Sequence, residues 1–590
     1  MDVRLNGKTL AITFPYDPVA VEMIKGLPQR RWNKTAKRWE CKPSYSNMKY
    51  LRGTFPEARW DAESCALWVE AEIMSSKRDV IAAGEVNFDA LKGVLFKKPP
   101  MKHQMKALLL ARDMPYFAYL MDQGTGKTKT TIDDAAHNWR EDRIDAMLVI
   151  SPNSVKTNWV MAECHKTHPS DMDAIEDHMP DDVPVVKGVW ISSANAQERQ
   201  EWELFEKRIN EAAASPRSSL VLLSVNVDAL NVGRCFEFLQ AFVDTFRTML
   251  VVDEATKIAK RGSKRTKAAM KLRSACPVAR VLTGTPVTKS PMNAFSIFGF
   301  LHEDILGFGN FYSFRNRYCV MGGYMGKQVL NYRNMDQLAD SIASCSFRVL
   351  KRDCLDLPPQ VYLKRRVTLS PPQAKAYAQM VAEMKAEWKD DEIEAPIVLT
   401  QLLRLQEIVG GYLPIITPEG DRVGVHELVA PEKNPKFTEV LNIIEDADEK
   451  FVVWSRFIPE IEAIGKLLTE KGYKIGMFYG ATPERERTIM RKQMLRGELD
   501  GIVGNPAAGG LGIDEFKVAP LSIYLSNSFD TEARVQSEDR QHRFGSDMHD
   551  KITYWDIMAP NTVDVKIIRT MRNNVEVATA VMKDGWREWI

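Results

Sequence analysis

Within this chain of 590 residues, the stretch Met121-Asp-Gln-Gly-Thr-Gly-Lys-Thr128 gives the strongest indication of the fold. Gly124 and Gly126 permit a strand-to-helix turn in which backbone N–H groups approach a phosphate. Lys127 supplies a positive charge there, and the hydroxyl of Thr128 suits Mg²⁺. The strict pattern begins with glycine, where this chain has Met121, so a chance Gly-x-Gly turn is the alternative.

The residues around this loop support a phosphate site rather than a chance turn. The apolar run Tyr116-Phe-Ala-Tyr-Leu120 precedes the loop as a buried strand would, and a helix-permitting segment follows from Lys129. A strand, a phosphate loop and a helix in this order predict an α/β fold with a mainly parallel sheet.

A second apolar run, Thr248-Met-Leu-Val-Val252, ends in two adjacent carboxylates, Asp253 and Glu254. Folds of this class place their chemistry at the ends of buried strands. Asp253 is expected to hold Mg²⁺ against the phosphates of a nucleoside triphosphate, and Glu254 to orient and deprotonate the attacking water. A solvated acidic surface is the alternative, but four consecutive apolar residues before the pair oppose it.

Length and composition predict a large globular protein with several domains. A chain of 590 residues exceeds what one core supports, and we expect three to four domains. No apolar run approaches the roughly 18 residues that cross a membrane, and Met1-Asp-Val-Arg-Leu5 lacks a signal-peptide pattern. Eight cysteines without a C-x-x-C pair suit a reducing compartment. We expect a monomer without a membrane partner, in the cytoplasm of a bacterial or virus-infected cell, or in the nucleus of a eukaryote.

The overall net charge of +2 conceals a basic start of the chain. Residues 1 to 60 contain twelve Lys or Arg against five Asp or Glu. Within them, cations alternate with tryptophans, a mixture that binds a phosphate backbone and stacks on bases. The residues expected to bind nucleic acid here are Arg31, Trp32, Lys37, Arg38 and Trp39. The alternative is that both tryptophans are core residues of a small β-rich module.

Further motifs occur in an order that resembles the Swi/Snf-type branch of helicase superfamily two, over residues 99 to 570. Met101-Lys-His-Gln104 is similar to the adenine-reading motif of that family, and the resemblance implies that Gln104 contacts the base. Thr125 of the phosphate loop is expected to contact the nucleotide. Leu148 to Trp159 resembles a strand and loop that touch the tracking strand, which implies a nucleic acid contact by Trp159. Arg280-Val-Leu-Thr-Gly-Thr-Pro286 is similar to the motif that links hydrolysis to DNA binding, carried by Thr283 and Thr285.

A second lobe is implied by motifs that follow in the same order. Phe451-Val-Val-Trp-Ser455, Met477 to Thr482 and Ile502 to Ile513 resemble the nucleic acid face of that lobe. The resemblance implies nucleic acid contacts by Ser455, Arg456 and Gly480, and nucleotide contacts by Gly512 and Gln536.

Two arginines in Gln536-Ser-Glu-Asp-Arg-Gln-His-Arg-Phe-Gly545 resemble arginine fingers. We expect Arg540 and Arg543 to lie three apart on one helix face. A guanidinium from the second lobe neutralises charge on the transferring phosphoryl group, so hydrolysis would require closure of the lobes. A surface helix with the same spacing is the alternative.

Two positions depart from the family pattern. Thr256 stands where the family usually has histidine, at a position that couples the ATP site to the DNA-contacting motif, so the coupling is expected to differ. Thr125 replaces a usual leucine, while Lys127 and Thr128 are kept, so nucleotide binding is expected to survive.

The basic run from Lys257 to Arg273 contains eight cations and no acidic residue. We expect it to face phosphates, with Lys257, Lys260 and Arg261 as contacts, and such contacts read no sequence. The alternative is a solvated basic helix.

The first sixty residues also resemble the HepA-related (HARP-like) module. The resemblance rests on Phe14-x-Tyr16, Lys25-Gly-Leu-Pro28 and the run from Arg31 to Trp39, and it implies recognition of forked or junction DNA. The expected architecture is α/β, with two RecA-like lobes of mainly parallel sheets, a helical insertion between them and a small α+β N-terminal domain. The expected bounds are 1–70 for the module, 71–98 for a linker, 99–300 for lobe 1, 301–430 for a helical insertion and linker with the hinge near 417–435, and 431–590 for lobe 2.

These motifs predict an enzyme that uses ATP and Mg²⁺ and acts on double-stranded or forked DNA. The expected function is a DNA-dependent ATPase that translocates along duplex and remodels or re-anneals branched DNA. A strand-separating helicase or RNA-dependent ATPase is one alternative. A non-hydrolysing DNA-binding platform is another, and it is opposed by the presence of Lys127, Asp253, Glu254 and Arg543.

Overall fold

The protein is described from a computed structural model that forms two compact units. Unit 1 comprises residues 1–164 and 172–354, and unit 2 comprises residues 165–171 and 355–590. The structure describes residues 1–7, 9–27, 30–69, 71–72, 91, 93–192, 194–215, 217–284, 291–308, 310–322, 328–387, 395–416, 422–506, 515–529 and 531–572.

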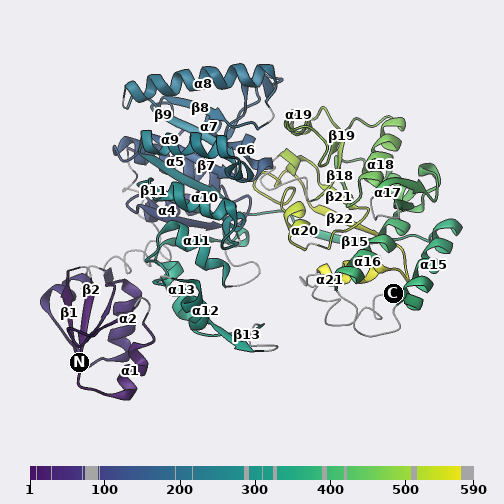
Figure 1. Cartoon of the computed structure of the whole chain (residues 1–590). Coiled ribbons are helices and arrows are strands. Elements are labelled where there is room, and N and C mark those ends of the chain that lie inside the picture. Colours follow the sequence, from purple (N-terminus) through teal and green to yellow (C-terminus); the bar gives the residue numbers. More distant parts are fainter. Residues whose placement is uncertain are drawn as a thin grey trace. The chain divides into compact units, whose positions relative to one another are not determined.

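The first seventy residues form the small α+β module that the sequence predicts (Figure 1). Five strands in the order β3-β4-β2-β1-β5 make its sheet. Their bounds are β1 (Asp2–Asn6), β2 (Thr9–Thr13), β3 (Arg31–Asn33), β4 (Arg38–Cys41) and β5 (Arg59–Trp60). Helices α1 (Pro18–Ile24) and α2 (Tyr45–Thr54) contribute Ile24 and Leu51 to its apolar core.

The main sheet of unit 1 has seven strands in the order β14-β6-β11-β10-β7-β9-β8, and every neighbouring pair is parallel. Strands β7, β10 and β11 are buried along their whole length, as apolar strands of a covered parallel sheet are. The strands are β6 (Tyr116–Met121), β7 (Ala146–Ser151), β8 (Val185–Val189), β9 (Leu220–Asn226), β10 (Thr248–Asp253), β11 (Val278–Leu282) and β14 (Ser346–Val349).

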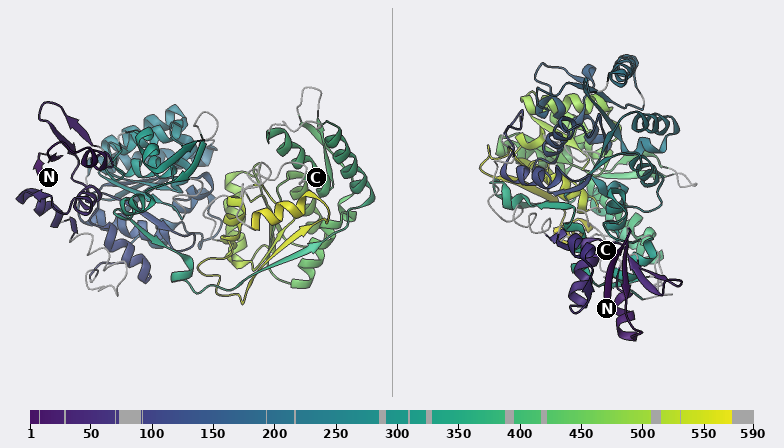
Figure 2. Two further views of the ribbon diagram at one scale, coloured as in Figure 1. Left: turned by 90° about the horizontal axis from the view of Figure 1, so that it is seen from below. Right: turned by 90° about the vertical axis from the view of Figure 1, so that its left-hand side faces the viewer.

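Helices cover both faces of this sheet (Figure 2). The order in which the chain adds strands runs from β6 toward the β8 edge and then returns from β8 through β9 and β10 to β11. Helix α5 follows β6 and leads outward to β7, whereas α8, α9 and α10 join strands in the returning direction. Right-handed crossovers therefore place α5 on one face and the other three on the opposite face. The helices are α4 (Lys102–Ala111), α5 (Lys127–Arg140), α6 (Asn153–Trp159), α7 (Ala174–His178), α8 (Ala196–Ala214), α9 (Gly233–Thr245), α10 (Lys264–Arg273) and α11 (Asn293–Leu301).

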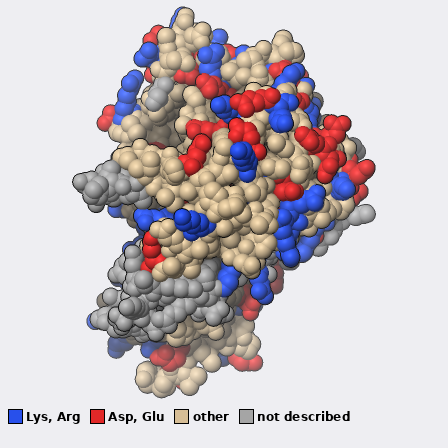
Figure 3. All heavy atoms as spheres, turned by 90° about the vertical axis from the view of Figure 1, so that its right-hand side faces the viewer, with Lys and Arg blue, Asp and Glu red and all other residues tan. Residues whose placement is uncertain are grey.

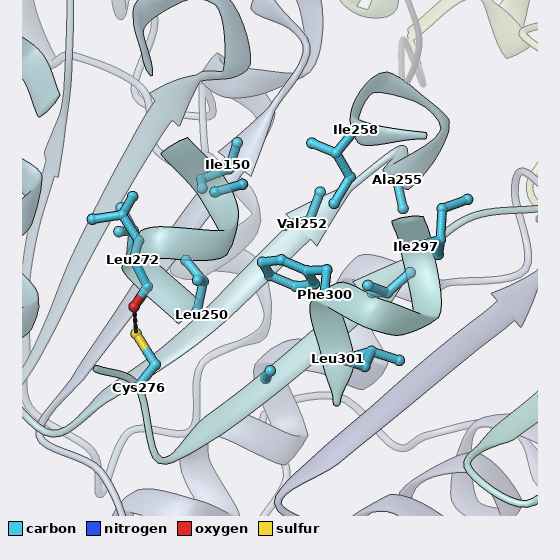
Figure 4. Close-up of a cluster of buried hydrophobic side chains, with 14 of the residues drawn as sticks. Ile150, Leu250, Val252, Ala255, Ile258, Leu272, Cys276, Ile297, Phe300 and Leu301 are labelled. Carbon is cyan, nitrogen blue, oxygen red and sulfur yellow. Dashed lines mark hydrogen bonds between the residues drawn. The ribbon is translucent and has the colours of Figure 1, made fainter. Parts of the chain in front are cut away.

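A dense apolar core fixes β10, the strand that ends in Asp253 (Figure 4). Leu250 and Val252 of β10 pack with Leu272 of α10 and with Phe300 and Leu301 of α11. Close packing of this kind transmits strain and resists displacement. The position of the strand end is therefore set by the core beneath it.

The last part of unit 1 contains further elements before and after the edge strand β14. They are α12 (Phe311–Tyr318), the hairpin of β12 (Cys319–Gly322) with β13 (Gln328–Tyr332), α13 (Met335–Ala343) and α14 (Lys351–Cys354). Strand β14 then pairs with β6, so this segment belongs to lobe 1.

Unit 2 contains a six-stranded parallel sheet in the order β15-β22-β21-β18-β20-β19. Its strands are β15 (Gln360–Arg366), β18 (Phe451–Trp454), β19 (Ile475–Phe478), β20 (Gly501–Gly504), β21 (Leu521–Tyr524) and β22 (Ile552–Met558). Its helices are α15 (Pro371–Glu387), α16 (Ala395–Gly410), α17 (Pro435–Ala447), α18 (Ile458–Glu470), α19 (Glu484–Arg496), α20 (Thr531–Glu538) and α21 (Val563–Arg572), and β16 (Tyr412–Ile416) pairs with β17 (Arg422–Glu427). The prediction of two lobes built on parallel sheets is confirmed.

The predicted division of the chain at residues 301 and 431 differs from the structure. Strand β14 at 346–349 is an edge strand of the first sheet, and β15 at 360–366 is an edge strand of the second. The units meet in sequence between Cys354 and Leu355, so the expected hinge near 417–435 falls inside unit 2. The predicted helical stretch from 371 to 405 does form α15 and α16, and these helices also lie in unit 2.

The surface is mixed in charge, as the near-neutral total predicts. On the face drawn in Figure 3, lysine and arginine side chains lie among aspartate and glutamate side chains. Within the described residues, no helix has the length and apolar character needed to cross a bilayer.

Candidate functional site

The phosphate loop runs from the end of β6 to the start of α5, as its sequence predicts. Gly124 and Gly126 have φ angles of 82° and 87°, in the left-handed region that glycine adopts without strain. The Thr125 hydroxyl donates to the Asp122 carbonyl over 2.8 Å, which closes the turn from within. The turn therefore requires glycine at both positions.

Lys127 is folded back onto the strand that precedes the loop. Its Nζ donates to the carbonyls of Met121 and Asp122 over 2.9 and 3.2 Å. Gly284, just after β11, lies against the same residues, since a Cβ there would be 3.3 Å from the Asp122 Cα. The loops after β6 and β11 are thus in contact at the carboxyl edge of the sheet.

Gln104 touches the loop directly from α4. Its Nε2 donates to the Thr125 carbonyl over 3.2 Å, while its Oε1 accepts from the Met101 amide over 2.9 Å. A ring nitrogen of His103 lies 2.7 Å from the same Thr125 carbonyl, and burial lowers the pKa of this histidine. Two consecutive side chains therefore contact one loop carbonyl, and the contact by His103 was not predicted from the sequence.

The acidic pair occupies the end of β10 as predicted. Asp253 is the last residue of the strand and is 6% exposed. Glu254 follows with a φ of 52°, a left-handed conformation that is strained for a residue with a side chain. Such strain persists where surrounding structure enforces it, and it is typical of functional sites.

The Asp253 carboxylate is oriented at both oxygens. Oδ1 accepts from the Glu254 amide, and Oδ2 accepts from the indole Nε1 of Trp159, each over 2.9 Å. Trp159 is fully buried at the end of α6. The indole therefore faces the acidic pair, and the nucleic acid contact expected of Trp159 stays a prediction.

A buried ion pair anchors the helix that begins at Lys127. Arg280 of β11 donates from Nε to Asp134 of α5 over 2.6 Å, and the Tyr119 hydroxyl donates to the same carboxylate over 2.9 Å. All three side chains are fully buried. The arrangement ties α5 to β6 and β11, the elements that frame the phosphate loop.

The two expected arginine fingers are not on one helix. Helix α20 ends at Glu538, so Arg540 and Arg543 lie in the turns that follow it. Arg540 is 2% exposed, its guanidinium lies 5.9 Å from the Trp454 ring, and burial lowers its pKa to about 9. Arg543 is only partly buried. The prediction of a shared helix face is wrong, and Arg543 is the more accessible of the two.

Gln536 lies on α20 and is partly buried. Gly512 and Thr285, two further predicted residues, fall outside the described residues.

Two more residues predicted to touch nucleic acid are buried. Thr283 follows β11 with no exposed surface. Ser455 follows β18, also without exposed surface, and its hydroxyl donates to Glu460. Their side chains are enclosed in this structure, and the nucleic acid contacts expected of both residues stay predictions. The cause of this enclosure is their place at the ends of strands buried on both faces.

The aromatic and basic residues of the N-terminal module lie on the hairpin of β3 and β4. Trp32 and Trp39 are cross-strand partners with ring centroids 5.3 Å apart, and Trp32 is 44% exposed. Arg31 and Lys37 are exposed. Arg38 is paired with Glu40 over 2.9 Å, so its charge is partly balanced within the hairpin.

The basic run after the acidic pair divides into two groups. Arg265 pairs with Asp228, and Arg273 donates to the carbonyls of Leu301 and Cys276. These two cations therefore make contacts within the protein. Lys260 and Arg261 are exposed, and Lys257 is partly buried.

In unit 2, the Arg456 guanidinium lies 4.2 Å from the centroid of the Phe529 ring. Burial lowers the pKa of Arg456 to about 10. Gly480 is exposed, and a Cβ there would meet nothing within 4 Å. A ligand backbone can approach that position.

The residues around the loop fit a nucleotide and a divalent cation. Left-handed glycines open the turn, Lys127 supplies charge, and Thr128 lies in the first turn of α5. Asp253 offers a carboxylate that is already oriented by two N–H donors. This donor set, of hard oxygen ligands beside a lysine, is the one that Mg²⁺ and phosphates require.

Comparison with known proteins agrees with this geometry. Residues 103–410 match the family described as the SNF2-related domain. The chain is 28% identical over 121 residues to proteins described as "ATP-dependent RNA helicase RhlB" from Shewanella baltica and Shewanella oneidensis, over 20% of this chain and 26% of those relatives. The chain therefore matches about a quarter of the length of these relatives.

Two solved structures from Sulfolobus solfataricus also resemble the chain. The SWI2/SNF2 ATPase core in complex with dsDNA is 19% identical, with 83% of this chain and 94% of that chain covered at a TM-score of 0.35. The core domain alone is 19% identical, with 83% and 90% covered at 0.33. At these TM-scores the comparison adds nothing to the assignment. The family match covers more than half of the chain, and the protein therefore belongs to the SNF2-related domain family of ATP-hydrolysing, helicase-like enzymes.

Proposed function

We propose that this protein is an ATP-driven double-stranded DNA translocase that remodels or re-anneals branched DNA. The observation that carries the proposal is the meeting of a phosphate loop and an oriented acidic pair at one edge of the sheet, in a chain of the SNF2-related family. The family match supports ATP hydrolysis, and the dependence on duplex DNA is our proposal.

The roles within lobe 1 follow from the chemistry of each group. The loop amides and Lys127 bind the phosphates of ATP, for which Lys127 must leave the carbonyls of Met121 and Asp122. Thr128 and Asp253 hold Mg²⁺, which neutralises charge on the phosphate oxygens. Glu254 orients the attacking water and accepts its proton, because its carboxylate immediately follows that of Asp253.

In this proposal, the second lobe supplies the positive charge that acts on the transferring phosphoryl group. Arg543 is only partly buried, and a guanidinium can stabilise charge that develops on the transferring phosphoryl group. Arg540 is packed against Trp454 and supports the segment that carries Arg543. Turnover then requires the lobes to close, which makes hydrolysis sensitive to what the lobes bind.

DNA binding is assigned to exposed cations and one exposed ring. Arg31, Lys37, Lys260 and Arg261 are exposed and can contact phosphates, and Trp32 can stack on a base. Phosphate contacts read no sequence, so the N-terminal hairpin would select the structure of the DNA, such as a fork, rather than its sequence.

A strand-separating helicase or RNA-dependent ATPase is the second candidate. The relatives described as RNA helicases favour it, although the match covers only 121 residues. A non-hydrolysing binding platform is less consistent with Lys127, Asp253 and Glu254, since such a protein needs no water-activating carboxylate.

Displacement of a third strand from a duplex tests translocation directly. The full chain, ATP and Mg²⁺ should release a triplex-forming oligonucleotide from duplex DNA without separating the two strands beneath it. The Glu254→Gln protein provides the background. Release of the duplex strands themselves, or activity on RNA alone, would favour the second candidate.

A further inference from the structure

Trp159 makes a hydrogen bond whose position suggests a role beyond packing. Its Nε1 donates to Asp253 Oδ2 over 2.9 Å, and both side chains are buried. The other carboxylate oxygen accepts from the Glu254 amide. Since a carboxylate with two fixed donors cannot rotate freely, its remaining lone pairs point in set directions.

The helix that carries Trp159 is itself anchored. Helix α6 follows β7 at the carboxyl edge of the sheet, directly beside β10. Lys156 of α6 is 2% exposed, and its Nζ donates to the Trp190 carbonyl over 2.9 Å. The Ser224 hydroxyl of β9 donates to the Lys156 carbonyl over 3.0 Å. These bonds hold the indole in place against Asp253.

We propose that Trp159 is a positioning residue that orients Asp253 for Mg²⁺ and thereby sets the affinity of the site for the metal. The proposal rests on the proposed function, because it assumes that Asp253 holds Mg²⁺. Groups that orient a metal ligand typically change metal affinity or activity by 10- to 100-fold when they are removed. Removal of the indole N–H leaves the carboxylate in place but frees it to rotate.

The test compares two tryptophans of the same lobe. Trp159→Phe removes the N–H donor and keeps an aromatic ring. Trp139→Phe is the matched control, because the indole Nε1 of Trp139 is buried without a hydrogen-bond partner among the described residues. ATP turnover is measured against Mg²⁺ concentration at fixed ATP, and binding of a fluorescent ADP analogue is measured with Mg²⁺ and with EDTA.

Trp159→Phe should raise the Mg²⁺ concentration for half-maximal turnover about ten-fold, by the range for such groups. Nucleotide affinity in EDTA should stay at the wild-type value, and Trp139→Phe should leave all readouts unchanged. An unchanged Mg²⁺ requirement in Trp159→Phe would overturn the proposal. A wild-type protein whose nucleotide binding and turnover do not depend on Mg²⁺ would count against the proposed function instead.

A double variant separates positioning from a general loss of structure. The quantity compared is the gain in affinity for the ADP analogue when Mg²⁺ is added. In an Asp253→Asn background, Trp159→Phe should not lower this gain further, because the carboxylate that Trp159 orients is absent. A loss of the same size in both backgrounds would mean that Trp159 only packs, even if the single variant is unstable. That result would overturn the proposal.

Discussion

The carboxyl edge of the first sheet and the N-terminal hairpin differ in how they treat their functional side chains. At the sheet edge, Asp253, Gln104 and Trp159 are buried, and each makes hydrogen bonds to its neighbours. On the hairpin, Arg31 and Trp32 are exposed, and Trp32 touches its cross-strand partner Trp39. The edge thus presents side chains that are buried and fixed by hydrogen bonds, whereas the hairpin presents side chains that are exposed.

Burial also divides the residues that were predicted to contact a nucleic acid into a buried group and an exposed group. Trp159, Thr283 and Ser455 belong to motifs whose resemblance implied nucleic acid contacts, yet all three are buried. Their motifs mark the ends of buried strands, where a side chain most often serves the fold or the neighbouring site. Other residues predicted to contact a nucleic acid, such as Arg261 and Gly480, are exposed.

The largest expected effect is at the acidic pair. Glu254→Gln should lower ATP turnover by about 10³-fold or more, because it removes the group that accepts a proton from water. Binding of a fluorescent ADP analogue with Mg²⁺ should remain, since Asp253 and Lys127 are intact. Full turnover in this variant would show that another group activates the water.

Arg543→Ala should follow, with a fall in turnover of about 10³-fold. Arg485→Ala is the control, because Arg485 is an exposed arginine of α19 in the same unit. Stopped-flow measurement of phosphate release at saturating ATP gives both rates. Equal turnover in Arg543→Ala and Arg485→Ala would show that Arg543 is not the arginine finger.

A buried ion pair gives a prediction for stability. Arg280→Met removes the guanidinium that pairs with the fully buried Asp134, which should cost about 3 to 5 kcal/mol of unfolding free energy. Urea unfolding of the wild-type and variant proteins measures the difference. The double variant Arg280→Met with Asp134→Leu should recover most of the loss, and failure to recover it would contradict the ion-pair explanation.

The smallest expected effect is on the hairpin. Trp32→Ala should weaken forked DNA binding about ten-fold, since stacking of one base contributes about 1 to 3 kcal/mol. Turnover without DNA should not change. Val19→Ala is the control, because Val19 is 62% exposed on α1 of the same module and lies outside the hairpin and outside the residues that carry the resemblance. A similar loss of affinity for forked DNA in both variants would contradict a specific role of the hairpin in binding.

Periodicity and motifs were enough to predict the elements around the phosphate loop. The apolar runs before Met121 and Asp253 form β6 and β10, because long buried strands leave an unambiguous pattern. The boundary between the units was not predictable in the same way. The burial of β15 alternates along its sequence, and β14 is only four residues long, so neither stands out from a connecting segment.

The contacts of individual side chains required the structure. The indole of Trp159 meets Asp253 across 94 positions of sequence, and no local pattern encodes such a pairing. Likewise, the end of α20 at Glu538 removes Arg540 from the helix, although Gln536 to Gly545 contains no proline that would mark a stop. His103 could have been found, since it adjoins Gln104 in the same short motif.

Steady-state ATP turnover measured with no nucleic acid, single-stranded DNA, blunt duplex, forked DNA and RNA tests the central claim most directly. The Glu254→Gln protein sets the background in each condition. We predict strong stimulation by duplex or forked DNA and little by single strands or RNA. Stimulation by single strands or RNA alone, or no turnover above the Glu254→Gln background in any condition, would contradict the account.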